Sequence, residues 1–361
     1  SYTYQEVFAR VRGIMPFVQD CPEDIIGIIA EDRIETYASI LAVLLSGKTY
    51  VILHPNYPDS RNRNIAEATG MKQVLYGHDS GTRQGLPTEI TCISTVELRD
   101  EDREHAAWEQ VQDENRNAYI IFTSGSTGVP KGVPISRKNL NAFYTAYHQL
   151  GWQLGPTDRM LQMFELTFDV SVVSTLYPLT LGASVYTVGT NQLKYMKVYE
   201  LMEDEELTFA AMPPSLLQFL SPYFDEIHVP KLKYLIVTAE AANADLLQRF
   251  RGCAPNAEFV NLYGPTEATI YCTAYRIPPE NCKQHNGMIA IGRPFSGLET
   301  IIMDEKGMPV AEGEQGELWV SGEQVMRGYW QDEDKSRQVF ARFNGKEYYK
   351  TGDLCSVDSD G

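Results

Sequence analysis

Short apolar runs alternate with amphipathic segments along this chain as far as Leu262. Continuous apolar runs such as Ile25–Ile29 are typical of strands that are buried on both faces. Segments such as Thr36–Ser46 instead repeat apolar residues with the period of a helix. Strand–helix alternation predicts parallel sheets covered by helices, and two successive series predict two doubly wound, mostly parallel sheets.

The pattern changes beyond Pro278, where short alternating runs such as Glu299–Met303 and Glu317–Ser321 predict an antiparallel barrel or sandwich. The expected fold class is therefore α/β. We expect a first α/β layer over residues 1–150, a second over residues 151–277 and a smaller antiparallel barrel-like subdomain over residues 278–361. Residues 78–117, where the pattern weakens and charge rises, are expected to form an exposed loop and helix.

The net charge of −17 argues against partners that are nucleic acids or anionic membranes. The chain has no apolar run of the ~18 residues that a membrane-spanning helix needs, and Ser1 opens no signal peptide. Its six cysteines are scattered and include no Cys-x-x-Cys pair, which fits neither a disulfide framework nor a zinc site. We therefore expect a cytoplasmic protein with no membrane insertion and no nucleic-acid partner.

The apolar run Tyr119–Phe122 leads directly into glycines, hydroxyls and a lysine. Glycines let backbone N–H groups approach an anion, hydroxyls donate hydrogen bonds, and a lysine supplies charge, so this segment predicts a phosphate-binding loop. The Walker pattern does not fit, because Lys131 lies between Pro130 and Gly132. The alternative is a flexible hairpin between two strands. The predicted phosphate ligands are Thr123, Ser124, Gly125, Ser126, Thr127, Gly128 and Lys131.

A second polar stretch, Asn261–Glu267, follows a predicted strand and so lies where ligands of open α/β sheets bind. Asn261 is suited to the edge of a purine, Tyr263 to stacking on its face, and Glu267 to a divalent cation. The alternative is an ordinary Gly-Pro turn with an exposed glutamate.

Two aspartates stand in contexts that need an explanation. Asp353 follows a Thr-Gly turn, where its carboxylate can accept from both ribose hydroxyls; the alternative is a capping residue of that turn. Asp169 lies in an apolar run, where a carboxylate is costly without a partner. Asp169 is therefore expected to cap the helix that begins at Val170, to receive a substrate ammonium group, or to do both.

These stretches occur in one order in one chain, and together they resemble the motifs of the adenylate-forming superfamily. The resemblance is specifically to the amino-acid adenylation domains of nonribosomal peptide synthetases and their free-standing relatives. It runs from end to end through segments Thr3–Val7, Leu45–Arg61, Thr123–Gly132, Phe168–Ser171, Tyr263–Glu267, Gly316–Tyr329 and Thr351–Leu354.

The resemblance implies that an amino-acid carboxylate attacks the α-phosphorus of MgATP and releases pyrophosphate. The aminoacyl adenylate then passes to the phosphopantetheine thiol of a carrier protein. Thr266, Glu267 and Lys131 are implied as catalytic residues, with Glu267 as the Mg²⁺ ligand. Besides the phosphate loop, the implied nucleotide-binding residues are Glu240, Ala241, Asn261, Leu262, Tyr263, Gly264, Thr266 and Asp353.

In this family Asp169 is the position that receives the α-ammonium, which implies an α-amino acid substrate. The other implied substrate residues carry no charge, so a charged side chain would be left unpaired at a cost. Leu262, Ile270 and Tyr271 resemble a Leu-Ile-Trp trio of glycine-type pockets. We expect a small neutral amino acid, glycine first, then alanine or a valine-like residue. The pocket residues are Phe168, Asp169, Val170, Val173, Ala211, Val237, Ala239, Leu262, Ile270 and Tyr271.

The family continues beyond the Thr351–Leu354 motif into a hinge and a small C-terminal subdomain that carries its principal catalytic lysine. We expect this chain to end before that hinge and to lack the small subdomain. Lys131 is then expected to assist the leaving pyrophosphate. Two other functions remain open: an acyl-CoA synthetase that passes its adenylate to CoA, and a catalytically silent nucleotide-binding module.

Overall fold

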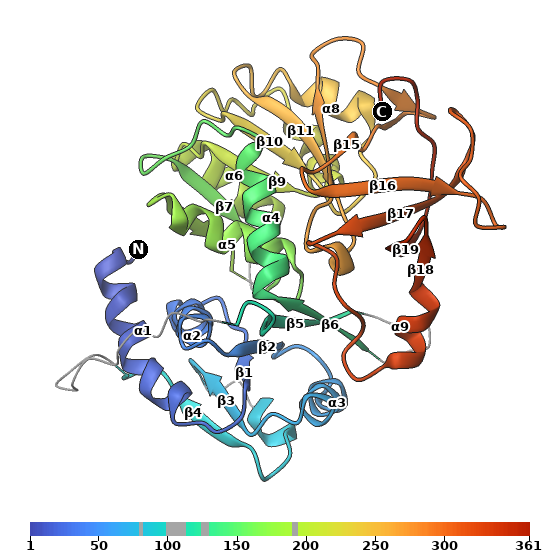
Figure 1. Ribbon diagram of the computed structural model, residues 1–361. Helices are drawn as coiled ribbons and strands as arrows, with labels where there is room; N and C mark the ends of the chain where they lie inside the picture. The colour runs from blue at the N-terminus through green and yellow to red at the C-terminus, as the bar shows by residue number, and fades with distance from the viewer. Residues whose placement is uncertain (79–81, 99–112, 124–129, 190–193) are drawn as a thin grey trace. The chain divides into compact units, whose positions relative to one another are not determined.

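The computed structural model describes residues 1–78, 82–98, 113–123, 130–189 and 194–361 (Figure 1). The chain divides into two compact units, which are described separately. Unit 1 contains Ser1–Leu140 and Met326–Ser336, and unit 2 contains Asn141–Val325 and Arg337–Gly361. The three-part division expected from the sequence remains a prediction.

The strands of unit 1 are β1 (Ile25–Ile29), β2 (Thr49–Leu53), β3 (Gln73–Tyr76), β4 (Thr91–Ser94), β5 (Asn117–Thr123) and β6 (Lys131–Ser136). They form one sheet in the order β4-β3-β1-β2-β5-β6. All pairs are parallel except β5 with β6. Every residue of β1 and β2 is buried, which explains the apolar runs Ile25–Ile29 and Tyr50–Leu53. The helical segments are α1 (Tyr4–Gln19), α2 (Ile34–Leu45), α3 (Asp59–Thr69) and η1 (Thr82–Gly85).

Helix α1 begins where the sequence provides a capping box. The Thr3 hydroxyl accepts from the backbone N–H of Glu6 at 3.2 Å, and the Glu6 carboxylate accepts from the Thr3 N–H at 2.7 Å. The buried face of the helix consists of Val11, Ile14, Met15 and Val18.

Two strands of unit 1 differ from the main prediction: β4 was not predicted, and β6 was included only in the alternative of a hairpin between two strands. The segment β4 lies at the sheet edge with both of its ends exposed, so it lacks the apolar run of a buried strand. The segment β6 pairs antiparallel with β5, with Thr123 opposite Lys131. A connection this short cannot return a strand in the parallel direction, which explains why β6 departs from the expected pattern. The expectation of only loop and helix over residues 78–117 is therefore wrong at β4.

The main sheet of unit 2 has the order β15-β12-β11-β10-β9-β7-β8. The pairs from β11 through β8 are parallel, and β12 and β15 add an antiparallel edge that was not predicted. Its strands are β7 (Arg159–Gln162), β8 (Ser184–Thr187), β9 (Phe209–Met212), β10 (Tyr234–Val237), β11 (Glu258–Tyr263), β12 (Thr273–Ile277) and β15 (Arg293–Pro294).

Helices of unit 2 alternate with these strands, as expected for a doubly wound arrangement. They are α5 (Val170–Thr180), α6 (Lys194–Asp204), α7 (Pro214–Leu220), η2 (Ser221–Tyr223), α8 (Ala244–Phe250) and η3 (Thr266–Ala268). Asn243 caps α8 through its side chain, which accepts from the N–H of Leu246 at 3.1 Å. Helices α4 (Arg137–Gln149) and α9 (Glu333–Val339) each begin in unit 1 and end in unit 2.

The last part of unit 2 is antiparallel, as predicted. A sheet of order β16-β17-β19-β18 is formed by β16 (Leu298–Met303), β17 (Gly316–Gly322), β18 (Phe340–Phe343) and β19 (Lys346–Cys355), drawn in orange and red in Figure 1. A small pair is formed by β13 (Gln284–His285) and β14 (Met288–Ile289). The predicted fold class, two mostly parallel α/β sheets plus a smaller antiparallel sheet, is confirmed.

Candidate active site

Several predicted substrate and nucleotide residues of unit 2 lie at the carboxyl ends of neighbouring strands in its main sheet. The strands β9, β10 and β11 are parallel neighbours, and Val237 pairs with Met212 on one side and Asn261 on the other. The carboxyl ends of these strands therefore lie together, which is where ligands of open α/β sheets bind. Ala211 lies in β9, Val237 ends β10, and Asn261, Leu262 and Tyr263 end β11.

Asp169 is buried immediately before α5, with 7% of its surface exposed. The pKa of its carboxyl is raised to about 7, chiefly by burial and in addition by the neighbouring Glu267 carboxylate, while the Thr266 hydroxyl opposes the shift. Within the described residues, Asp169 Oδ2 has no hydrogen-bond partner. The site therefore holds a buried acceptor that no described group of the protein satisfies.

The predicted capping role of Asp169 is wrong. Asp169 occupies the N-cap position of α5, but its side chain makes no capping hydrogen bond. A capping residue normally has extended backbone angles that turn its side chain toward the free N–H groups. The backbone of Asp169 is instead helical, with φ −66° and ψ −26°, which is not the extended conformation of a typical capping residue.

The loop between β11 and β12 carries Thr266 and Glu267 on its first half. A Cβ added at Gly264 would lie 2.6 Å from the Cα of Tyr271, so only glycine permits the two halves of this loop to pack so closely. The Cys272 N–H donates to the Tyr263 carbonyl at 2.8 Å and closes the loop at its base. Glu267 is 5% exposed and close enough to Asp169 to influence its pKa.

The second half of this loop contains two residues with left-handed backbone angles. Thr269 has φ 60° and Ile270 has φ 72°, and both are β-branched, for which this region is costly. Such conformations persist only where surrounding contacts hold them. Ile270 and the following Tyr271 are almost completely buried.

The predicted pocket residues differ in exposure. Val237 packs in the main hydrophobic cluster of unit 2. Ala239 is exposed and has φ 68°, and 58% of Phe168 is exposed. The remaining uncharged members are buried: Val170, Val173, Ala211, Leu262, Ile270 and Tyr271.

The predicted adenine and ribose residues make defined contacts. The Asn261 amide donates to the Ala290 carbonyl at 3.0 Å. The Tyr263 hydroxyl donates to the Asp353 carboxylate, so the structure brings these two distant motifs together. Burial, followed by this hydrogen bond, raises the pKa of Tyr263 well above its usual value and keeps the phenol protonated.

The exposed residues Glu240 and Ala241 follow β10, close to the same strand end. The Glu240 carboxylate accepts from the backbone N–H of Ser215 at 2.9 Å and from its hydroxyl at 2.8 Å. This contact ties the loop after β10 to the first turn of α7.

Unit 1 contains the two ends of the predicted phosphate loop, Thr123 and Lys131, while Ser124, Gly125, Ser126, Thr127 and Gly128 lie outside the described residues. Within the described residues, the buried Thr123 hydroxyl has no hydrogen-bond partner. The Lys131 ammonium donates to the Tyr329 hydroxyl at 2.9 Å and lies 4.6 Å from the centre of its ring. Tyr329 belongs to a segment whose Trp330 N–H donates to the Gly132 carbonyl at 2.8 Å.

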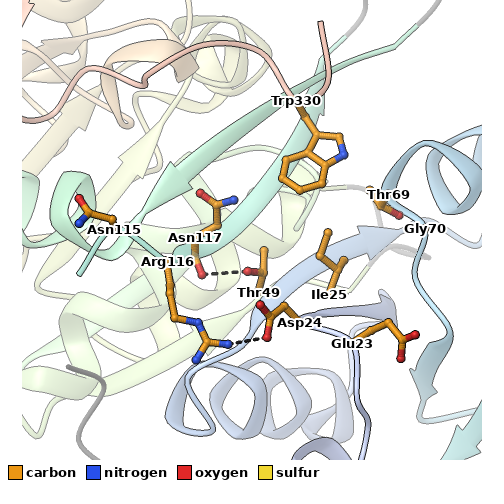
Figure 2. A pocket seen from close by; sticks show the side chains of 10 residues that line it. All are labelled: Glu23, Asp24, Ile25, Thr49, Thr69, Gly70, Asn115, Arg116, Asn117 and Trp330. Atoms are coloured by element: carbon orange, nitrogen blue, oxygen red, sulfur yellow. Dashed lines mark hydrogen bonds and ion pairs between the residues drawn. The ribbon is translucent and has the colours of Figure 1, made fainter. Parts of the chain in front are cut away.

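Unit 1 contains a separate pocket, which lies at the amino ends of parallel strands and not at their carboxyl ends (Figure 2). Ile25, Thr49 and Asn117 line it, and each begins a strand, so the pocket is at the amino ends of β1, β2 and β5. Arg116, its basic wall residue, already pairs with Asp24 at 2.5 Å. Ligands of open α/β sheets bind at the carboxyl ends instead, so we do not assign this pocket to the active site.

The sequence assigned no role to two residues that contact predicted site residues, one in each unit. Tyr329 was noted only as part of a motif, and its contact with Lys131 joins residues 198 apart in the chain. Gln324, a buried residue beside the loop after β11, carries no local pattern that distinguishes it from a surface glutamine.

The fold and this arrangement define an α/β protein with a candidate ligand site at the carboxyl ends of parallel strands. Residues 1–330 match the model of the family described as AMP-binding enzyme. The chain therefore belongs to the AMP-binding enzyme family, and the predictions of the adenylate-forming superfamily and of an adenylating ligase are confirmed at this level.

Two relatives illustrate the similarity. Zwittermicin A synthase ZmaJ of Bacillus cereus is 31% identical, with 100% of this chain and 70% of that protein covered. Tyrocidine synthase 2 of Brevibacillus parabrevis is 30% identical, with 94% of this chain but 9% of that protein covered. The chain thus spans most of the first relative and a small part of the second.

Two solved structures share the fold. The Vibrio cholerae adenylation domain AlmE in complex with glycyl-adenosine-5'-phosphate has a TM-score of 0.84 and 25% identity, covering 99% of this chain and 73% of that chain. The nonribosomal peptide synthetase FmoA3 in its AMPPNP-bound form has a TM-score of 0.90 and 25% identity, covering 99% and 39%. No helix in the described part of the chain is long and apolar enough to cross a membrane.

Proposed function

We propose that this chain activates a small neutral α-amino acid as its aminoacyl adenylate, with release of pyrophosphate. The observation that carries the proposal is Asp169, whose buried Oδ2 atom lacks a partner among the described residues. A buried carboxylate is stabilised most effectively by a cation, and the α-ammonium of an amino acid is such a cation. A fatty or aryl acid has no ammonium to offer, so Asp169 favours an amino acid over the substrates of acyl-CoA synthetases.

We propose glycine as the preferred substrate, followed by alanine and valine-like residues. The uncharged side chains Val170, Val173, Leu262, Ile270 and Tyr271 favour a neutral substrate, because an ionic side chain among them would be unpaired. The glycyl adenylate bound to AlmE, which is 25% identical, adds support for glycine. Because Ala211 is small and Ala239 is exposed, alanine and valine remain the next candidates.

The proposed reaction is an in-line displacement. A carboxylate oxygen of the amino acid attacks the α-phosphorus, the bond from phosphorus to the oxygen that bridges to the β-phosphate breaks, and pyrophosphate leaves with the bonding electrons. Positioning and charge neutralisation supply most of the rate in such transfers. Thr266 is proposed to donate to the α-phosphate, and Asn261, Tyr263 and Asp353 to hold the nucleoside.

Mg²⁺ would bind at Glu267, which is a buried carboxylate and so has the ligand chemistry that this ion prefers. Within the described residues, no group of three or more His, Cys, Asp or Glu side chains is arranged to hold a metal ion. A Mg²⁺ ion at Glu267 would therefore take its remaining ligands from phosphates and water, which is its usual mode in nucleotide sites. The bound ion supplies charge neutralisation on the phosphates.

The aminoacyl group is proposed to pass to the phosphopantetheine thiol of a carrier protein, as the resemblance to peptide synthetases implies. A cytoplasmic location is also proposed, and the six cysteines, all of which are free thiols, support it.

The substrate proposal is tested by ATP–pyrophosphate exchange with the full-length protein and each of the twenty amino acids. We expect the highest kcat/KM with glycine, then alanine and valine. Each methylene that the pocket must accommodate or leave empty changes kcat/KM by about 10-fold or more. Highest exchange with phenylalanine or with a charged amino acid would contradict the proposed pocket.

Lys131→Ala is expected to raise the KM for ATP by about tenfold or more, because a charge-assisted contact to the phosphates is lost. Tyr329→Phe keeps the ring against Lys131 and removes only the hydroxyl, so we expect a change of less than about threefold. Steady-state exchange kinetics with ATP as the varied substrate measure both. An unchanged KM in Lys131→Ala would rule out the proposed contact with phosphate.

A further inference from the structure

We propose that Gln324 is a positioning residue of the amino-acid pocket: its side-chain amide fixes the loop that presents Ile270 and Tyr271. This inference rests on the proposed function, because it treats these two residues as pocket residues. Gln324 lies 53 residues from Tyr271 in the sequence, and no motif assigns it a role.

The loop needs an external constraint. Thr269 and Ile270 are consecutive β-branched residues with positive φ, a conformation that isolated chains avoid. The loop's own hydrogen bonds, from Ala268 N–H to Pro265 O at 2.9 Å and from Tyr271 N–H to Thr269 O at 2.9 Å, span only one turn each. The Cys272 N–H closes the base of the loop on the Tyr263 carbonyl at 2.8 Å, but none of these backbone bonds joins Ala268 to Tyr271, the residues that flank the strained pair.

Gln324 makes that connection. Its Nε2 atom donates to the Tyr271 carbonyl at 2.9 Å and to the Ala268 carbonyl at 3.3 Å, one on each side of the strained pair. The Thr269 hydroxyl donates to the backbone carbonyl of Gln324. Gln324 is 2% exposed and Thr269 is fully buried, so water does not compete for these contacts.

The orientation of the Gln324 amide follows from its partners. Two carbonyl oxygens face the same terminal atom, and an amide oxygen at that place would find no donor. The opposite atom, Gln324 Oε1, is buried and has no hydrogen-bond partner among the described residues. The buried, unsatisfied oxygen costs free energy that offsets part of the gain from the two donated hydrogen bonds. The Gln324 amide therefore adds little net stability, and its main effect is to fix the two carbonyls.

The position of the contacts determines what they control. Tyr271 follows the strained pair directly, and its ring packs with Phe143 and Tyr147 at centroid distances of 6.2 Å and 6.4 Å. Release of the Ala268 and Tyr271 carbonyls would let the strained pair relax and move the two side chains that bound the pocket. Thr266 and Glu267 precede both anchored carbonyls, and Ala268 N–H remains bonded to the Pro265 carbonyl at 2.9 Å, so we expect the phosphate-binding half of the loop to be affected less.

Gln324→Met tests the proposal, because methionine has the length of glutamine and lacks both donors and the unsatisfied oxygen. We expect the KM for the preferred amino acid to rise about tenfold, as two net hydrogen bonds predict. The kcat/KM preference over the next larger amino acid should fall by a similar factor, while the KM for ATP changes less than about threefold. Exchange kinetics of the full-length protein across the amino acids measure all three.

The matched control is Gln73→Met in unit 1, where a buried glutamine also donates to a carbonyl, that of Phe17, at 3.0 Å. This control should leave the substrate preference unchanged. If Gln324→Met does not fold, Gln324→Asn decides in its place, since its shorter amide cannot reach both carbonyls and should lower the same preference ratio.

An active parent enzyme whose substrate preference is the same in the Gln324 variants would overturn the positioning role, even if their thermal stability fell. Absence of amino-acid-dependent exchange in the parent enzyme would instead overturn the proposed function. The two failures are thus distinguished by the parent enzyme alone.

Discussion

Asp169→Asn is expected to abolish amino-acid activation, by about 10³-fold or more in kcat/KM, and yet to make the ligand-free protein more stable at pH 8. The loss follows because the buried partner of the substrate ammonium becomes neutral. The KM for ATP is expected to stay within about threefold, since Asp169 is not among the nucleotide-binding residues. Exchange kinetics and thermal unfolding of the same preparations measure both effects.

The gain in stability follows from the sign of the pKa shift. The pKa of Asp169 rises from its ordinary 3.8 to about 7 in the folded protein. A carboxyl whose pKa is raised by folding destabilises the native state above that pKa, and the cost is relieved as pH falls from 7 toward 3.8. Asparagine removes a cost of at most roughly 4 kcal/mol at pH 8, at about 1.36 kcal/mol per pKa unit.

Asp158→Asn is the matched control with the opposite expected sign. Asp158 is also buried, which raises its pKa, but Lys233 at 2.8 Å and the Thr208 hydroxyl lower the pKa below its usual value overall. A carboxyl with a lowered pKa stabilises the native state above its unfolded pKa. Asp158→Asn should therefore lower thermal stability at pH 8. If both variants were destabilised equally, the unpaired state of Asp169 would be contradicted.

The same titration predicts a pH dependence in the parent enzyme. Only the ionised carboxylate binds an ammonium group, and about nine-tenths of Asp169 is ionised one pH unit above its pKa. The KM for the amino acid should accordingly rise about tenfold from pH 8 to pH 6, while the KM for ATP rises less.

Glu267→Gln has the second large expected effect. We expect exchange to fall by about 10²-fold or more, because the proposed Mg²⁺ ligand is lost. The Glu267 carboxylate also raises the pKa of Asp169, so replacing Glu267 by the neutral glutamine should lower the pKa of Asp169. The rise in the amino-acid KM should then begin at a lower pH than in the parent enzyme. Mg²⁺ titrations and pH profiles of exchange measure these two consequences separately.

Glu258→Gln is a suitable control for Glu267→Gln, because it changes the glutamate that begins β11, the strand after which the Glu267 loop follows. It breaks an ion pair with Arg276 and should leave the Mg²⁺ dependence and the pH profile unchanged. A Glu267→Gln enzyme with an unaltered requirement for Mg²⁺ would show that the ion binds elsewhere.

The sequence was informative where one physical requirement determines the residue pattern. Strands buried on both faces must be apolar throughout, so β1 and β2 could be predicted from residues alone. Ligands of parallel sheets bind at strand ends, so Asn261 and Glu267 could be placed at one edge. The contact between Tyr263 and Asp353 could not be predicted, because it joins residues 90 apart through tertiary folding.

The sequence was uninformative where backbone geometry decides the outcome. Asp169 has the residue type of a helix cap, but its backbone has helical φ and ψ angles and its side chain makes no capping hydrogen bond. The strain at Thr269 and Ile270 has no sequence signature, since β-branched residues normally indicate an extended backbone. The role proposed for Gln324 depends on that strained backbone and on burial, and neither can be read from a sequence pattern.

The most direct test of amino-acid adenylation is to identify the adenylate that forms. The full-length protein is incubated with ATP, Mg²⁺ and an equimolar mixture of amino acids, and the nucleotides that it retains are identified by mass spectrometry. We predict glycyl-AMP as the main product, absent from Asp169→Asn. Retention of unreacted ATP alone, or formation of an adenylate from an acid without an α-amino group, would contradict the account.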